Sequence, residues 1–210
     1  APAARDPLAQ EAVVACAAQG KHLLCEKPVG MNAAEAEEMW VLYRDAQPTL
    51  AHFVPFWTRM VGVFEIARDI VGSGELGEIV STIFRWQNPR PAAMPLTWRD
   101  DPGLSSAGTI ADVGSHAYDV VRWIIGTEAD SVLAHGETLT PSKADLGAIN
   151  LEEALEWRAG EISEEVNTRQ GGTVDYASLS CRYANGAVGS YLLSHATFLR
   201  KHLAPELELH

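Results

Sequence analysis

Residues 6–25 place a helix, a tight turn and a short buried strand in direct succession, and this order constrains the fold most. Asp6-Pro7 is typical of a helix start, because aspartate caps free N–H groups and proline tolerates the first helical position. Gly20 ends the apolar periodicity of that helix, and an apolar run follows at 22–25. A helix that leads directly into a buried strand is the second half of a βαβ unit, so the segment predicts a parallel sheet.

A second helix and strand extend this pattern. Asn32 and Glu35 have the spacing of a capping box for a helix that runs to about Arg44, and residues 49–53 form another strand. A parallel sheet of only two strands would leave both edges open. We therefore interpret the segment up to residue 54 as the end of a parallel α/β domain whose beginning is absent from this sequence.

The remainder of the chain, 55–210, has the pattern of an α+β domain with an open, mostly antiparallel sheet. Asn185-Gly186 between two alternating runs is a strong signal for a two-residue hairpin. Two amphipathic helices are each followed by glycine, and a long polar and acidic excursion interrupts the pattern. The predicted elements are helices over 58–71 (ended by Gly72), 115–125 (ended by Gly126) and 151–157, strands over 79–86, 131–139, 174–183 and 187–194, a loop over 87–108 and the excursion over 141–172.

The letters at 72–77, Gly-Ser-Gly-Glu-Leu-Gly, match the dinucleotide-binding fingerprint G-x-G-x-x-G. That fingerprint works only after a strand and before a helix, where the helix N-terminus faces a pyrophosphate. Here a helix precedes the glycines and a strand follows them. We interpret the segment as a helix end and a turn.

Composition excludes several classes of function. The formal net charge is -12, and a field of that sign repels nucleic-acid phosphates and anionic lipid, although it still permits a nucleotide cofactor. No apolar run approaches the roughly 20 residues that span a bilayer, and no secretory signal is visible. Cys16, Cys25 and Cys181 lie among apolar residues without C-x-x-C spacing, which favours buried reduced thiols and a cytoplasmic location.

One candidate site is Glu26-Lys27-Pro28, at the carboxyl end of a predicted parallel strand. Ligands of open α/β sheets bind outside the carboxyl ends of strands, so the Lys27 ammonium can hold a substrate oxygen or polarise a carbonyl. The alternative is a surface lysine that pairs with a nearby acid. The sequence leaves open whether the peptide before Pro28 is cis.

A second candidate site lies at the start of the helix over 115–125. On a helix, Asp112, His116 and Asp119 share one side, and neighbouring carboxylates can set the pKa and tautomer of a histidine that acts as a general base. The same residues can instead brace a buried helix start. A metal ion is not expected, because one helix offers an incomplete ligand set.

Four segments in this order resemble the Gfo/Idh/MocA oxidoreductases, and the resemblance covers nearly the whole chain. The segments are GKHLLCEKP (20–28), GELGEI (74–79), AGTIADVGSHAYDVVRWIIG (107–126) and CRYANGAVGSY (181–191).

The resemblance implies a two-domain enzyme. Residues 1–54 would be the C-terminal part of a Rossmann domain, with Glu26, Lys27 and Pro28 near bound NAD or NADP, and residues 55–210 a domain for substrate binding and oligomerisation. Lys27, Asp112 and His116 would be catalytic and also bind substrate, with His116 as the acid/base. Asp119 would be a weaker contact, either to substrate or within the helix. The reaction would be hydride transfer between the nicotinamide ring and a secondary hydroxyl of a sugar, inositol or related polyol.

The resemblance also implies a homo-oligomer, dimer or tetramer, formed through the open sheet. The family's glycine-rich fingerprint would precede Ala1, and its sheet would continue beyond His210. At 106–108 this chain has Ser-Ala-Gly where the family has a run of glycines. The alternatives are a non-catalytic family member that senses a sugar or binds a protein, and a scaffold built on the sheet.

Overall fold

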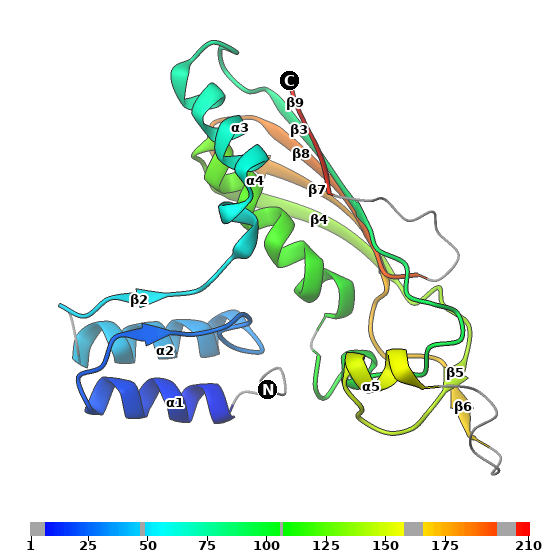
Figure 1. The fold of residues 1–210 in the computed structure, drawn as a ribbon. Coiled ribbons are helices and arrows are strands. Elements are labelled where there is room, and N and C mark those ends of the chain that lie inside the picture. Colours follow the sequence, from blue (N-terminus) through cyan, green and yellow to red (C-terminus); the bar gives the residue numbers. More distant parts are fainter. Residues whose placement is uncertain (1–6, 47–48, 106, 158–165, 197–204) are drawn as a thin grey trace.

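A computed structural model of the chain describes residues 7–46, 49–105, 107–157, 166–196 and 205–210 (Figure 1). The predicted helix cap at Asp6 lies outside these ranges, and so does Ser106, where the chain lacks a glycine of the family's glycine run. The chain forms a small helix–strand unit followed by a larger domain with a mixed sheet.

The first unit contains α1 (Pro7–Ala18), β1 (Leu23–Leu24), α2 (Ala33–Ala46) and β2 (His52–Phe53). The two strands pair in parallel, as predicted, and both helices lie on the same side of them (Figure 1). The buried centre consists of Val13, Ala17, Met39 and Tyr43.

Local signals account for the ends of these helices. Gly20 adopts φ 60° after α1, a conformation that glycine reaches without steric cost. At the start of α2, Asn32 Oδ1 accepts from the N–H of Glu35 at 3.0 Å. The Glu35 carboxylate accepts from the N–H of Met31 at 2.9 Å, one residue earlier than a capping box requires.

The second unit is built on a five-stranded sheet in the order β4-β7-β8-β3-β9. The neighbouring strands are antiparallel except for β3 and β8, which run parallel, so the predicted α+β class is confirmed with one parallel pair. Gly186, at φ 90°, lies in the predicted hairpin turn. The strands are β3 (Ser81–Gln87), β4 (Ala129–Glu137), β7 (Tyr176–Tyr183), β8 (Val188–Ser194) and β9 (Glu206–Leu209).

Helices α3 (Gly62–Ser73) and α4 (Ser115–Ile125) cover one face of this sheet (Figure 1). Val120 and Val121 of α4 are fully buried against it. A 3₁₀ turn, Trp57–Met60, precedes α3, and a π-helical turn, Ile110–Gly114, precedes α4.

The helix end predicted at Gly72 was wrong by two residues. Gly72 lies inside α3, and the left-handed residue that ends the helix is Gly74, at φ 78°. The turn at 74–80 then leads into β3. The interpretation of the fingerprint-like glycines as a helix end and turn is therefore confirmed.

The polar excursion forms a lobe beside the loop that follows β3 (Figure 1). It contains the short pair β5 (Lys143–Ala144) and β6 (Thr168–Arg169) and the predicted helix, α5 (Leu151–Glu156). The N–H of Leu96 donates to Ala144 O at 2.8 Å, so the lobe holds the loop over 87–108 in place.

The cysteine prediction holds for Cys181, which is buried, whereas Cys16 and Cys25 are partly exposed. These two belong to the small first unit, in which even Leu24 of β1 is 69% exposed. Two strands and two helices bury too little surface to enclose them.

Candidate functional site

The two units meet at Lys27. This residue follows β1, and its peptide bond with Pro28 is cis. The ammonium donates to the backbone oxygen of Asp112 at 2.8 Å and to its Oδ1 at 3.2 Å. The structure therefore brings together the predicted lysine and the predicted aspartate, which lie 85 residues apart.

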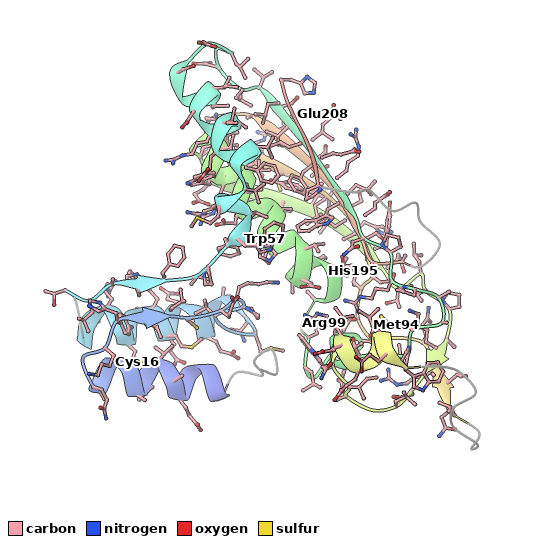
Figure 2. All side chains as sticks on the ribbon, in the orientation of Figure 1. Cys16, Trp57, Met94, Arg99, His195 and Glu208 are labelled. Atoms are coloured by element: carbon pink, nitrogen blue, oxygen red, sulfur yellow. The ribbon has the colours of Figure 1, made fainter. Side chains whose placement is uncertain are left out.

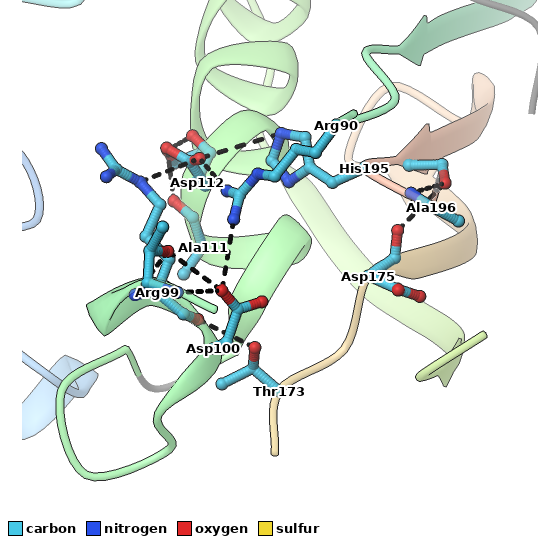
Figure 3. A network of polar contacts seen from close by, with 12 residues as sticks. Arg90, Arg99, Asp100, Ala111, Asp112, Thr173, Asp175, His195 and Ala196 are labelled. Atoms are coloured by element: carbon cyan, nitrogen blue, oxygen red, sulfur yellow. Dashed lines mark hydrogen bonds and ion pairs between the residues drawn. The ribbon is translucent and has the colours of Figure 1, made fainter. Parts of the chain in front are cut away.

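Asp112 lies in the π-helical turn before α4, and three more basic side chains surround it (Figure 3). Its Oδ2 lies 3.5 Å from Arg99 Nε, 3.7 Å from Arg90 Nη2 and 3.8 Å from His195 Nε2. The arginines belong to the loop after β3, and His195 follows β8 directly. One carboxylate thus ties together four parts of the fold.

These cations keep Asp112 ionised. Burial alone would raise the pKa of its carboxyl, but the nearby charges of Lys27, His195, Arg99 and Arg90 outweigh burial and lower the pKa to about 2.

A second carboxylate completes the network. Asp100 Oδ2 lies 3.7 Å from Arg90 Nη1 and accepts from the N–H of Thr97 at 2.8 Å. The cavity that Asp100, Arg90 and Asp112 line measures about 30 Å³. That volume suits a water molecule and not a sugar. These groups therefore form a packed support.

His116 lies in the first turn of α4 and is 7% exposed. The rings of Phe56, Trp57 and Trp86 surround it, with centroids 5.6, 5.8 and 6.3 Å away. Its Nδ1 is buried and makes no hydrogen bond within the described part of the chain. Burial and the Lys27 charge lower the imidazole pKa to about 4, against the opposite pull of Asp112 and Asp119, so the ring is neutral at physiological pH.

Asp119 lies further along α4 in an ion-pair cluster of its own. Its carboxylate accepts from Arg59 at 2.7 and 2.6 Å and from Arg122 at 3.1 Å, and the residue is 2% exposed. The expected common side for the three residues is only partly realised. Asp112 lies in the π-helical turn and His116 and Asp119 lie in α4, and the three side chains have three different surroundings.

The other predicted cofactor residues, Glu26 and Pro28, lie beside Lys27 at the carboxyl end of β1. Glu26 is exposed, and its Oε2 accepts from the backbone N–H of Lys27 at 3.3 Å. Among the described residues no group of three or more metal-ligating side chains comes together, and none of their helices is long and apolar enough to cross a membrane.

Sequence reasoning missed Arg90, Arg99 and His195 as parts of the site. A Thr-x-x-Asp capping box formed by Thr97 and Asp100 marks a structured turn inside the predicted loop, and it was the only available signal. No spacing connects these residues with Asp112, because they meet through the sheet and the excursion.

The chain thus combines a Rossmann-type parallel unit with a mixed-sheet unit, and a lysine–aspartate contact joins the two. Comparison with protein families gives the same result. The model described as "GFO/IDH/MocA C-terminal domain" matches residues 64–210, and the model described as "Oxidoreductase family, NAD-binding Rossmann fold" matches residues 3–52. The chain belongs to the GFO/IDH/MocA family.

Individual relatives are sugar and inositol dehydrogenases. The chain is 29% identical to levoglucosan dehydrogenase of Pseudarthrobacter phenanthrenivorans over 86% of its own length and 45% of that protein. It is 29% identical to myo-inositol 2-dehydrogenase of Thermotoga maritima over 85% of its length and 44% of that protein. The chain thus spans about half the length of these relatives.

Solved structures share the fold. An oxidoreductase domain protein from Kribbella flavida matches with a TM-score of 0.80 and 26% identity, over 95% of this chain and 50% of that one. A levoglucosan dehydrogenase in complex with NADH and levoglucosan matches with a TM-score of 0.79 and 25% identity, over 99% of this chain and 50% of that one.

Proposed function

We propose that the protein transfers a hydride between NAD or NADP and a secondary hydroxyl of a sugar, inositol or related polyol. The observation that carries this proposal is the contact of Lys27 with Asp112 across the two units, next to a neutral His116 whose Nδ1 has no partner among the described residues. The names of the relatives support the same class of reaction and give no support to a non-catalytic sensor.

The described residues fit one end of a nicotinamide cofactor. Glu26, Lys27 and Pro28 lie at the carboxyl end of β1, where α/β sheets bind nucleotides, and the buried, unpartnered Nδ1 of His116 is a polar atom suited to a ligand. The described residues contain no glycine-rich turn that leads from a strand into a helix, so Glu26, Lys27 and Pro28 would hold the reactive end and not the pyrophosphate. When bound, the nicotinamide ring accepts or donates the hydride.

Lys27 would hold the reacting hydroxyl. An ammonium group has three N–H donors, and Asp112 accepts from it through two oxygens, which leaves one donor for a substrate oxygen. The charge on Asp112 keeps the ammonium aimed at this position. In the oxidation direction, the cation also stabilises negative charge that develops on the hydroxyl oxygen.

His116 would handle the proton. Its neutral imidazole can take the hydroxyl proton when the alcohol becomes a ketone and return it in the reverse direction. The three aromatic rings around it exclude water, which limits exchange of that proton with solvent.

The test is turnover by the full-length protein with NAD and NADP and a panel of polyols, compared between wild type and H116A. We expect kcat to fall by about 10²- to 10⁴-fold in H116A while NADH binding, followed by nicotinamide fluorescence, is retained. H135A is the matched control, because His135 of β4 is 66% exposed on its side chain and lies outside the site. Unchanged turnover in H116A would refute the assigned role, and binding without turnover in wild type would favour the sensor.

We also propose that residues 1–54 and 55–210 are the two functional domains and that the protein is a cytoplasmic homo-oligomer, a dimer or tetramer formed through the open sheet. The sheet supports this proposal because Val132 and Leu133 of β4 are 62% and 76% exposed. Native mass spectrometry of the full-length protein tests it, and a monomer at micromolar concentration would refute it.

A further inference from the structure

The charges around Asp112 do not balance. Three cations, Lys27, Arg90 and Arg99, face two carboxylates, Asp100 and Asp112. Lys143 and Asp175 line the same small cavity and add one charge of each sign. Such a cluster of basic side chains in a chain of net charge -12 is a place where an anionic group can bind.

Arg99 is the cation with unused hydrogen-bonding capacity. Arg90 is shared between Asp100 and Asp112, and Lys27 donates twice to Asp112. Arg99 reaches Asp112 only through Nε, at 3.5 Å. Within the described residues, neither of its Nη groups makes a hydrogen bond or an ion pair. Four N–H donors of the guanidinium therefore remain for a ligand.

Hydrogen bonds nevertheless fix the backbone of Arg99, and a ring contact fixes the plane of its guanidinium. Its N–H donates to Thr97 Oγ1 at 3.3 Å, and its carbonyl oxygen accepts from Thr173 Oγ1 at 2.8 Å. The guanidinium carbon lies 4.2 Å from the centre of the Trp98 ring, which stacks against it. The side chain is 26% exposed, so a ligand can reach it.

The Arg99 guanidinium also points away from the centre of the ion-pair network. Figure 3 shows it at the outer edge of the network, turned away from Arg90 and His195. Lys27 contacts Oδ1 of Asp112 and Arg99 contacts Oδ2, so the two cations flank one carboxylate.

We propose that Arg99 determines substrate specificity and that the preferred substrate is a polyol with a carboxylate, as in an aldonate or a uronate. The carboxylate binds the free side of the Arg99 guanidinium in a bidentate manner, while the reacting hydroxyl lies at Lys27 and His116. This inference rests on the proposed oxidoreductase function, because it places the substrate in the same site.

The experiment compares acid and neutral probes of matched shape, D-glucuronate with D-glucose and D-galacturonate with D-galactose. Binding to the full-length protein is measured by calorimetry with NADH present, and turnover is measured with NAD and NADP. In wild type we expect the acids to bind about ten- to a hundredfold more tightly than the neutral sugars, the value of one charge-assisted pair. R99Q should lose this advantage, so that each acid and its neutral counterpart bind with similar affinity.

Two further variants separate recognition from structure. R99K keeps the charge beside Asp112 but loses the planar guanidinium and its paired N–H donors, so it should retain only part of the preference for acids. Because the charge is kept, R99K should fold even if R99Q does not. R182Q removes an exposed arginine of β7 and should leave the preference unchanged.

Each outcome has one meaning. Equal binding of acids and neutral sugars by wild type, or an equal loss for both in R99Q, would overturn the proposal. Arg99-dependent binding of acids without turnover of any polyol would support carboxylate recognition and refute the oxidoreductase function. Turnover of polyols without preference for acids would support the oxidoreductase function and refute carboxylate recognition by Arg99.

Discussion

Replacing Asp112 by asparagine tests the central electrostatic feature of the site. The substitution keeps the size of the side chain and removes its charge, so Lys27, Arg90 and Arg99 lose their common counter-ion. A carboxyl pKa that falls from 3.8 in the unfolded chain to about 2 in the folded protein corresponds to about 2 kcal/mol of stability at neutral pH. The side chain is only 26% exposed, so solvent screens this interaction weakly.

The pH dependence of the loss follows from the direction of the shift. Because the folded pKa lies below the unfolded one, the stabilisation is present above about pH 4 and is lost as the pH falls through about 2. We therefore expect wild type to exceed D112N in free energy of unfolding by about 2 kcal/mol at pH 7 and pH 5, and by about 1 kcal/mol at pH 3.

Urea titrations followed by tryptophan fluorescence on the full-length protein provide the measurement. D45N is the matched control, since Asp45 pairs with Arg44 on the surface and should show no resolvable change. A wild-type advantage that stays constant from pH 7 to pH 3, or that is absent at pH 7, would refute the reasoning, because the stabilisation would then not come from the ionised carboxylate.

Three further predictions concern other residues of the site. His116, with an imidazole pKa near 4, should remain neutral from pH 7 down to about pH 5 in ¹⁵N NMR spectra of the ring. Because protonation of His116 favours the unfolded chain, its contribution to stability should decline as the pH falls from 6.5 towards 4, and a ring that titrates near pH 6.5 would contradict its burial. D119A should lower the free energy of unfolding by about 3 kcal/mol, because two arginines lose their buried partner; a loss of kcat/KM at unchanged stability would instead indicate a substrate contact. G108A should lower the melting temperature by several degrees, because residue 108 has φ +50° and a Cβ there would lie 2.0 Å from a backbone carbonyl oxygen. G72A in α3 is the control, since its Cβ position is surrounded by open space. It should leave NADH binding intact and leave stability unchanged or slightly higher.

Much of the fold could be predicted because local rules control it. Helix ends at Gly20 and Gly126, the hairpin at Asn185-Gly186 and the short helix of the excursion all follow from backbone preferences of a few adjacent residues. The strand β9 had no such signal, since its pairing with β3 depends on a strand more than a hundred residues away.

The candidate site likewise has a part that the sequence predicts and a part that depends on the tertiary structure. The sequence by itself predicted Lys27, Asp112 and His116 as candidate site residues, because their positions at a strand end and a helix start have chemical meaning without a structure. Only the tertiary structure decided which groups meet them. It surrounded Asp112 with Arg90, Arg99 and His195, and among the described residues it gave the two Nη groups of Arg99 no partner.

The physical reason is the range of the interactions. Capping, turn formation and periodicity act over a few residues and can be recognised from spacing. Ion pairs and burial depend on through-space distance, which is set by how the sheet, the π-helical turn before α4 and the excursion pack together. The pKa of Asp112, the neutral state of His116 and the separate ion-pair cluster of Asp119 are properties of that packing, and no pattern along the chain encodes them.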